Sequence, residues 1–435
     1  MRHSWRLRVA IPMLAALSLS ISSYPRQVEA TVQMAGEDIL KTVEEPIDIG
    51  LVDQSDGRNL LPKPPHEDYV SGIPPSADTT VTIPFATPNQ FPENGPPRVL
   101  MTINGVYCGD EGVMMDTGST GITIGKGTWI DDFKGDWAQV VTNEKGWKYL
   151  SSSKKLYSGY WVPTELIFNG HSPAGERMNL MKAIAPVLVF DKFSICPGHT
   201  NAHGATCENP TSVKSGMLSG LYMGVGFGRE QDGMITCTPD KNPLLNVVEV
   251  NGMPVERQRY HLGYIIRSSS LICGLTPTNT KDYTWTPLSK QPHATDPRDW
   301  AMPPVAISIS NGRFRTGFIL PDTGVTQMYL SSPDISTPAE NYTVAFGVPD
   351  ETATVGGYVL SVGMNGTATS SINGTAPRVV RATCTAGRVT GPGGGVFERV
   401  YVNTGSRLWN GYEAAFDAVG GRWGLKRMNN GGSRL

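Results

Sequence analysis

The sequence predicts an all-β protein built from two similar halves, and three observations support this prediction. Glycine and proline are abundant, with 49 and 33 of 435 residues. Short β-branched and apolar runs, such as Thr79–Phe85 and Val99–Ile103, alternate with turn-forming residues. A strand–turn–strand unit that ends in Asp-Thr-Gly occurs once in each half, which indicates an internal repeat. Segments with helical periodicity are few.

The repeat defines the elements expected on either side of each motif. The first copy runs from Val99 through Asn104-Gly105 to Asp116-Thr117-Gly118, and the second from Val305 through Asn311-Gly312 to Asp322-Thr323-Gly324. Asn-Gly favours a tight hairpin turn. We therefore expect a hairpin before each Asp-Thr-Gly, an apolar strand leading into it, and a further strand after it.

The paired motifs predict a catalytic pair of carboxylates, Asp116 and Asp322. Two carboxyl groups about 3 Å apart share one proton, because both cannot ionise cheaply. The ionised group can then activate a water while the protonated group binds a substrate carbonyl. Thr117 and Thr323 can cross-link the two loops, and Gly118 and Gly324 allow close approach of the backbone. The alternative, two ordinary turns after strands, does not explain the apolar runs on both sides of each motif.

The two loops resemble those of the pepsin-like aspartic proteases. Met114–Thr120 is similar to the first catalytic loop of that family, and Pro321–Thr326 to the second. Gly220–Phe227 resembles the segment that backs the first loop, and Arg407–Asp417 with Arg422–Leu425 resembles the closing helix and strands. The resemblance implies a bilobal all-β fold with a cleft between the lobes. It also implies hydrolysis of a polypeptide substrate with neither a metal nor another cofactor.

Some residues depart from the family pattern. Ser119 follows Asp116 by three residues and can donate to its carboxylate, whereas Val325 at the matching place after Asp322 cannot. This difference predicts that Asp322 holds the shared proton longer, and that Val325→Thr moves the alkaline limb of activity to lower pH. Pro321 precedes the second aspartate, and Asn403-Thr404-Gly405 replaces an apolar pair and glycine. The flap, with Tyr149 or Tyr157 as its tyrosine, matches least. A non-catalytic binding or inhibitor-like protein is therefore the alternative function.

The first 30 residues predict export. Arg2, Arg6 and Arg8 precede an apolar stretch at Val9–Ile21, which is typical of a signal peptide; an uncleaved anchor is the alternative. The predicted parts are a signal peptide at 1–30, an arm or leader at 31–78, a first β lobe at 79–286, a linker at 287–304 and a second β lobe at 305–435. We expect a secreted or periplasmic monomer without stable membrane association. The net charge of −2, without a basic stripe, argues against nucleic acid as a partner.

The six cysteines are an even number, which favours disulfides in an exported protein. Cys196, His199, His203 and Cys207 also have a spacing that could hold zinc. Because the chain is predicted to be exported, we favour a Cys196–Cys207 disulfide that closes a polar loop, rather than a zinc site. We therefore expect no metal.

Overall fold

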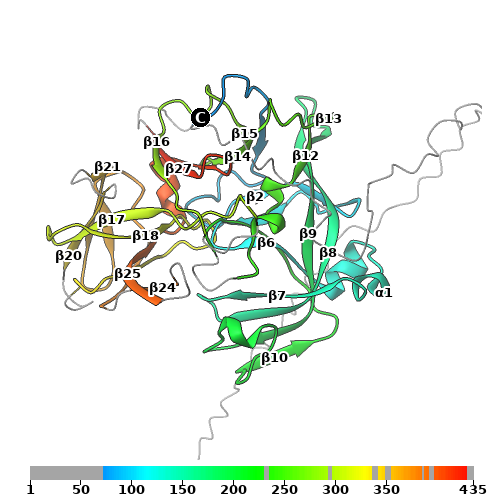
Figure 1. Cartoon of the computed structure of the whole chain (residues 1–435), viewed down its shortest axis with the longest axis horizontal. Coiled ribbons are helices and arrows are strands. Elements are labelled where there is room, and N and C mark those ends of the chain that lie inside the picture. The colour runs from blue at the N-terminus through cyan, green and yellow to red at the C-terminus, as the bar shows by residue number, and fades with distance from the viewer. Residues whose placement is uncertain are drawn as a thin grey trace, which may run out of the picture. The chain divides into compact units, whose positions relative to one another are not determined.

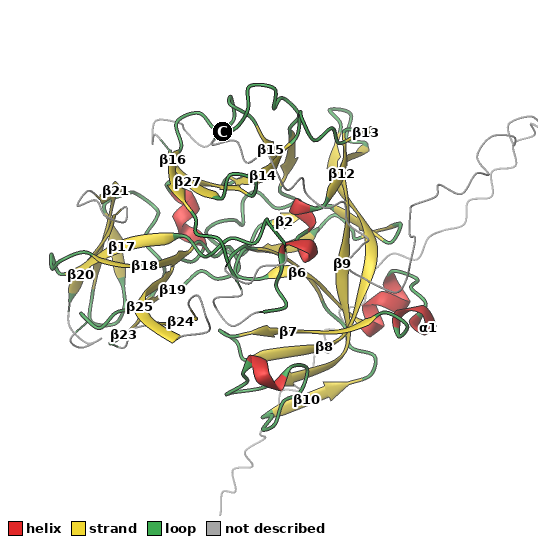
Figure 2. Ribbon diagram, in the orientation of Figure 1, coloured by secondary structure: helices red, strands yellow, loops and turns green. Residues whose placement is uncertain are grey.

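Strands dominate the computed structural model, which describes residues 72–229, 235–291, 296–335, 341–347, 354–384, 387–390 and 396–428 (Figures 1 and 2). The prediction of an all-β chain is confirmed. Helical segments in these residues are short: Thr128–Asp132, α1 (Trp137–Val140), Asn201–His203, Pro239–Lys241, Pro243–Leu245 and Ser406–Asn410. The predicted signal peptide and residues 31–71 of the predicted arm lie outside the described residues.

The first half of the chain forms a twelve-stranded sheet around two long strands, β8 (Lys155–His171) and β9 (Arg177–Ile195), which pair along their length. The main path of the sheet is β2-β5-β11-β6-β9-β8-β3-β4. All side chains of β6 are buried, as expected for a strand covered on both faces. The other strands are β2 (Arg98–Val99), β3 (Met101–Ile103), β4 (Val106–Tyr107), β5 (Val113–Asp116), β6 (Thr120–Gly125), β7 (Glu144–Leu150), β10 (Ser212–Ser215), β11 (Leu221–Val225), β12 (Val247–Val250) and β13 (Met253–Pro254).

The second half forms a nine-stranded sheet with the main path β22-β21-β20-β17-β18-β25-β19-β23, and β24 pairs with β25. Its central pattern repeats that of the first half. β18 runs parallel to β25 and β19 antiparallel to it, as β5 and β6 do to β11. The strands are β17 (Pro304–Ile309), β18 (Arg315–Leu320), β19 (Met328–Ser331), β20 (Tyr342–Gly347), β21 (Thr354–Val362), β22 (Ala368–Ser370), β23 (Val380–Thr383), β24 (Gly387–Thr390) and β25 (Val396–Asn403).

A six-stranded sheet joins the two halves, in the order β1-β15-β14-β26-β27-β16. The junction is the antiparallel pair β14–β26, in which Gly263 lies opposite Asp417. Asp417 is fully buried and accepts hydrogen bonds from Arg422 and from the backbone of Val419 and Gly420. The strands are β1 (Val81–Pro84), β14 (His261–Ile266), β15 (Ser270–Leu275), β16 (Thr284–Pro287), β26 (Tyr412–Asp417) and β27 (Arg422–Arg427).

Both predicted hairpin turns are present, with one shift of position. Asn104 and Gly105 both have positive φ, 51° and 77°, and connect β3 to β4. In the second half the positive φ values belong to Ser310 and Asn311, at 49° and 59°. The Asn-Gly pairs differ by one residue in their distance from the aspartate, whereas the turns themselves lie at the same distance. The backbone repeat is therefore more regular than the sequence repeat.

The predicted lobes and linker stay predictions. The segment between β16 and β17 contains the buried residues Trp300, Ala301 and Met302, and Trp300 donates a hydrogen bond to the carbonyl of Ala418 at 2.8 Å. Residues 300–302 are therefore packed next to the six-stranded sheet. Within the parts of the chain that the structure describes, no helix is long and apolar enough to cross a membrane.

Candidate active site

The two Asp-Thr-Gly loops meet through reciprocal hydrogen bonds between their threonines. The backbone N–H of Thr117 donates to Thr323 Oγ1 at 3.0 Å, and the N–H of Thr323 donates to Thr117 Oγ1 at 2.9 Å. Each hydroxyl then donates onward across the site, to the carbonyl of Pro321 at 2.6 Å and of Met115 at 2.9 Å. Both side chains are buried. The loops are 206 residues apart in sequence, so this network fixes a site between distant segments.

Glycines bring each loop against the carboxylate of the other. A Cβ placed on Gly118 would lie 2.7 Å from Asp322 Oδ2, and one on Gly324 would lie 2.5 Å from Asp116 Oδ1. The Gly324 position is also 3.2 Å from Asp322 Oδ1, so one point lies next to both carboxylates. Any side chain here would clash with a carboxylate oxygen of the pair, which explains why both positions are glycine.

Asp116 lies at the end of β5 and has a hydrogen-bond donor on each oxygen. The N–H of Gly118 donates to Oδ1 and the hydroxyl of Ser119 donates to Oδ2, both at 2.7 Å. Strand β11 supports this loop from behind, because Gly224 pairs with Asp116 in parallel register. A Cβ on Gly224 would lie 2.7 Å from Ser119 Oγ. The Gly220–Phe227 segment thus backs the first loop, as the resemblance implied.

Asp322 is the more buried carboxyl group, with 6% of its surface exposed. Burial, followed by the negative charge of Asp116, raises the pKa of Asp322 to about 7, against the lowering effects of Asn403, the Gly324 amide and Arg229. Its Oδ1 accepts from Gly324 N–H at 2.8 Å, and its Oδ2 accepts from Asn403 Nδ2 at 2.6 Å. The predicted direction, with the proton on Asp322, agrees with this environment.

The predicted reason for that asymmetry is wrong. Val325 indeed offers no donor, but Asn403 donates to Asp322 Oδ2, as Ser119 does to Asp116 Oδ2. The burial of Asp322 and the charge of Asp116 raise the pKa instead. Sequence reasoning noted Asn403 as a departure and missed its role, since it is 81 residues from Asp322.

Pro321 causes less disruption than its place before the aspartate suggests. Strand β18 ends at Leu320, so Pro321 lies beyond the strand, and its carbonyl accepts the Thr117 hydroxyl. Met115 at the matching place is inside β5, and its N–H donates to Pro97. The proline therefore removes one peripheral backbone bond and keeps the acceptor that the site uses.

Neither flap candidate is bonded to the dyad in the structure. The hydroxyl of Tyr149 donates to the carbonyl of Cys196 at 3.0 Å, and its ring centroid lies 4.4 Å from that of His199. Tyr157 packs against the rings of Phe190, Phe193 and Tyr222. The β7–β8 hairpin that carries both tyrosines is thus held by the 196–207 loop and by the sheet.

The predicted Cys196–Cys207 disulfide is present, with Cα atoms 5.8 Å apart. His199 Nε2 lies 2.8 Å from the carbonyl of Gly204, and His203 Nδ1 accepts from the N–H of Thr200 at 3.1 Å. Within the described ranges, no group of three or more His, Cys, Asp or Glu side chains is placed to hold a metal ion. The even cysteine count led us to expect further disulfides, and this is wrong: Cys108, Cys237, Cys273 and Cys384 are free thiols.

Lys148 is a second buried group near the dyad that the sequence did not reveal. This β7 side chain is fully buried; its Nζ donates to the carbonyl of Gly121 at 2.9 Å and lies 4.5 Å from the Tyr222 ring centroid. Burial lowers its pKa to about 8, partly offset by Cys237 and by Asp116. Sequence gave no signal, because a lysine in an alternating strand normally faces solvent.

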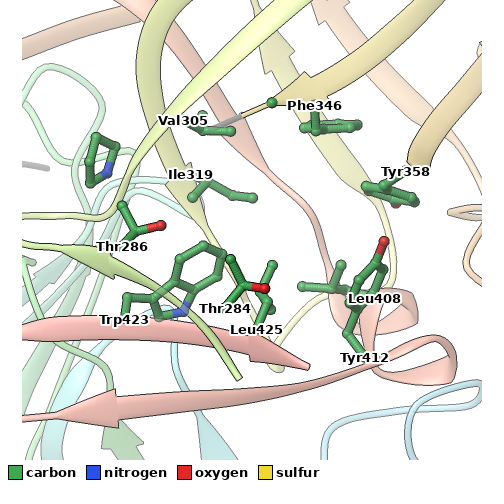
Figure 3. A pocket seen from close by; sticks show the side chains of 12 residues that line it. Thr284, Thr286, Val305, Ile319, Phe346, Tyr358, Leu408, Tyr412, Trp423 and Leu425 are labelled. Carbon is green, nitrogen blue, oxygen red and sulfur yellow. The ribbon is translucent and has the colours of Figure 1, made fainter. Parts of the chain in front are cut away.

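The enclosed cavity in Figure 3 lies elsewhere, between β16 and β27 on one side and β17, β18 and β20 on the other. Trp423, Ile319 and Tyr358 are among the side chains that line it. The lining contains no carboxylate, thiol, imidazole or amine. The paired aspartates are therefore a better candidate site than this cavity.

Comparisons with known proteins give a distant structural likeness. No protein-family model and no curated protein matches the chain. Among solved structures, it is similar to the aspartic proteinase from Irpex lacteus over 81% of this chain and 98% of that chain, with 12% identity and a TM-score of 0.40. A likeness of this degree carries no functional conclusion by itself. What defines the class is the geometry above: an all-β protein whose two halves each contribute an Asp-Thr-Gly loop to one paired-carboxylate site.

Proposed function

We propose that this protein is an exported aspartic endopeptidase that hydrolyses peptide bonds with a water activated by Asp116 and Asp322. The observation that carries the proposal is the reciprocal bonding of Thr117 and Thr323, which holds two distant Asp-Thr-Gly loops face to face. A pair of unrelated turns has no reason to exchange hydrogen bonds in this symmetric way or to face glycines toward carboxylates.

The unequal surroundings of the carboxyl groups suggest their roles. Asp322 is protonated and donates to the carbonyl oxygen of the substrate, while ionised Asp116 takes a proton from water as the water oxygen attacks the carbonyl carbon. Asp322 gives its proton to the carbonyl oxygen, which forms a neutral gem-diol. Asp116 then passes its proton to the leaving nitrogen, the C–N bond breaks, and a hydroxyl of the diol returns a proton to Asp322.

Export and the nature of the partner belong to the same proposal. The Cys196–Cys207 disulfide favours an oxidising compartment, secreted or periplasmic. The substrate is a polypeptide, and the chain acts as a monomer without nucleic acid or stable membrane association.

A direct test is hydrolysis of denatured casein by the purified protein across acidic to neutral pH, with and without a statine-type inhibitor. We expect inhibitor-sensitive cleavage. Asp116→Asn and Asp322→Asn should each abolish nearly all of it, and the double variant should be little worse, because the pair acts as a unit. Asp78→Asn is the matched control, since that carboxylate is on the surface and pairs with Arg259. A folded single variant that keeps most of its activity would refute the dyad.

A non-catalytic binding protein with the same scaffold is the second candidate. The observation that favours it is the placement of the two flap tyrosines: Tyr149 donates to the backbone carbonyl of Cys196, and the Tyr157 ring packs against that of Phe193. This candidate predicts that a statine-type inhibitor binds without any casein cleavage by the wild-type protein. Calorimetry beside the cleavage assay separates the two functions.

A further inference from the structure

The second catalytic loop lacks the hydroxyl that supports the first. Ser119 Oγ donates to Asp116 Oδ2 at 2.7 Å, and Val325 holds the corresponding place after Asp322. Without a donor to Oδ2, the buried carboxyl group of Asp322 would be free to rotate. Its ionised form would also lack one stabilising hydrogen bond. The structure supplies a donor from another strand instead.

Asn403 provides this donor from the end of β25. Its Nδ2 donates to Asp322 Oδ2 at 2.6 Å, and its Oδ1 accepts the N–H of Gly405 at 3.0 Å. The second bond fixes which end of the amide faces the aspartate, because a backbone N–H requires an acceptor. The backbone of Asn403 is held by β18, where it pairs with Leu320, and by β19, where it pairs with Tyr329.

Comparison of the two halves shows that this donor does not come from the position equivalent to Ser119. In the first half, Gly224 lies opposite Asp116, and Tyr222 lies opposite Thr123 of β6. In the second half, Asn403 lies opposite Tyr329, the residue equivalent to Thr123. Asn403 and Tyr222 thus occupy equivalent places, and the first half puts no amide there. The donor that is missing at Val325 is therefore supplied from a different strand.

We propose that Asn403 is the positioning residue of Asp322 and takes over the part that Ser119 plays for Asp116. This inference rests on the proposed function for its catalytic meaning. A hydroxyl can donate or accept, whereas the –NH₂ of an amide only donates. Asn403 therefore holds Oδ2 as an acceptor, as the N–H of Gly324 holds Oδ1, and together the two donors fix the orientation of the Asp322 carboxyl group.

The central test is a rescue across strands. Asn403→Leu removes the donor at similar volume and should lower kcat/KM by about tenfold or more, as expected for loss of a hydrogen bond to a charged group. The alkaline limb should move up by about one pH unit, because the ionised pair loses support. Val325→Thr alone should change little, since Oδ2 already has a donor. In the Asn403→Leu background it should restore both rate and alkaline limb.

Asn169→Leu is the matched control. Asn169 is fully buried, and its amide bonds to Thr102 and Asn179 rather than to the dyad. It should lose stability without any shift of the alkaline limb. The charged groups that face Asp322, Asp116 and Arg229, are unchanged in every variant. If Val325→Thr fails to restore the folded Asn403→Leu variant, or if the control shifts equally, the inference is wrong.

A stability measurement tests the inference even if the protein proves to have no protease activity. The donor favours ionised Asp322, so the destabilisation by Asn403→Leu should be larger at pH 8 than at pH 5, where the carboxyl group is protonated. If Asn403→Leu lowers the free energy of unfolding equally at pH 5 and pH 8, Asn403 has only a structural role and the inference is wrong. If Asn403→Leu is not recovered folded, Asn403→Ala provides the same comparison. Absence of inhibitor-sensitive cleavage by the wild type refutes the proposed function alone.

Discussion

Asp322→Asn should make the protein more stable at neutral and alkaline pH. The carboxyl group is 6% exposed, and its pKa is raised from 3.8 to about 7. In the unfolded chain it ionises near pH 4. Between these values the folded state binds more protons, so wild-type stability falls as pH rises and is lowest above the folded pKa. The asparagine variant cannot ionise and avoids this loss.

The size of the effect follows from the shift. A change of about three pKa units, at 1.36 kcal/mol each, corresponds to about 4 kcal/mol between pH 4 and pH 8. The assay is urea unfolding of both proteins at several pH values in this range. The stability of Asp322→Asn minus that of the wild type should rise by up to about 4 kcal/mol from the acidic to the alkaline end.

Taking this difference cancels the titration of the groups that do not interact with Asp322. Asp78→Asn is again the control: its pairing with Arg259 lowers the pKa of Asp78, so that carboxyl group titrates at or below the acidic end of this range and its difference from wild type should stay nearly constant towards pH 8. A difference between Asp322→Asn and wild type that stays constant from pH 4 to pH 8 would show that Asp322 ionises normally, which would refute the reasoning.

Three further predictions concern the threonine network, the disulfide and the buried lysine. Thr117→Val leaves two buried partners unsatisfied and should cost about 2–5 kcal/mol of unfolding free energy; combined with Thr323→Val it should cost clearly less than the sum, as a double-mutant cycle will measure. Peptide mapping without reductant should find Cys196 linked to Cys207, and replacing both by alanine should lower stability by up to about 3 kcal/mol, with unchanged stability counting against the bridge. Lys148, with a pKa lowered to about 8, makes wild-type stability rise between about pH 8 and 10.5. Lys148→Met should abolish that rise, and an unaltered alkaline profile would contradict the burial of its charge.

The sequence was informative where local chemistry determines the backbone. Asn104-Gly105 forms the turn that its preference for positive φ predicts, and Asp-Thr-Gly follows an apolar strand in both halves. The second turn lies one residue before the predicted Asn311-Gly312. Its positive φ values belong to Ser310 and Asn311, which are as far from Asp322 as Asn104 and Gly105 are from Asp116. Turn chemistry thus predicted the element, and the pairing of β17 with β18 determined its position.

Contacts between distant strands were beyond the sequence. The donor on Asp322 comes from a residue 81 positions away, and its role depends on the register of β18 with β25. The burial of Lys148 depends in the same way on the packing of β7 near β6 and β11, which places its Nζ against Gly121 and Tyr222. A prediction from Val325 alone therefore gave the wrong cause for the difference in proton affinity between Asp116 and Asp322.

The different surroundings of Asp116 and Asp322 can be compared at equivalent positions of the paired strands in the two halves. The equivalent strand positions hold Tyr222 beside the first aspartate and Asn403 beside the second. In the first half, the ammonium group of Lys148 lies over the Tyr222 ring, and its charge interacts favourably with Asp116. On the second side the donor is a neutral amide, and the carboxyl group is more deeply buried. Arg229 also places a positive charge beside Asp322, so charge alone does not distinguish the two sides. The deeper burial of Asp322 disfavours its ionised form, and this burial, rather than the missing hydroxyl at Val325, favours the shared proton on Asp322.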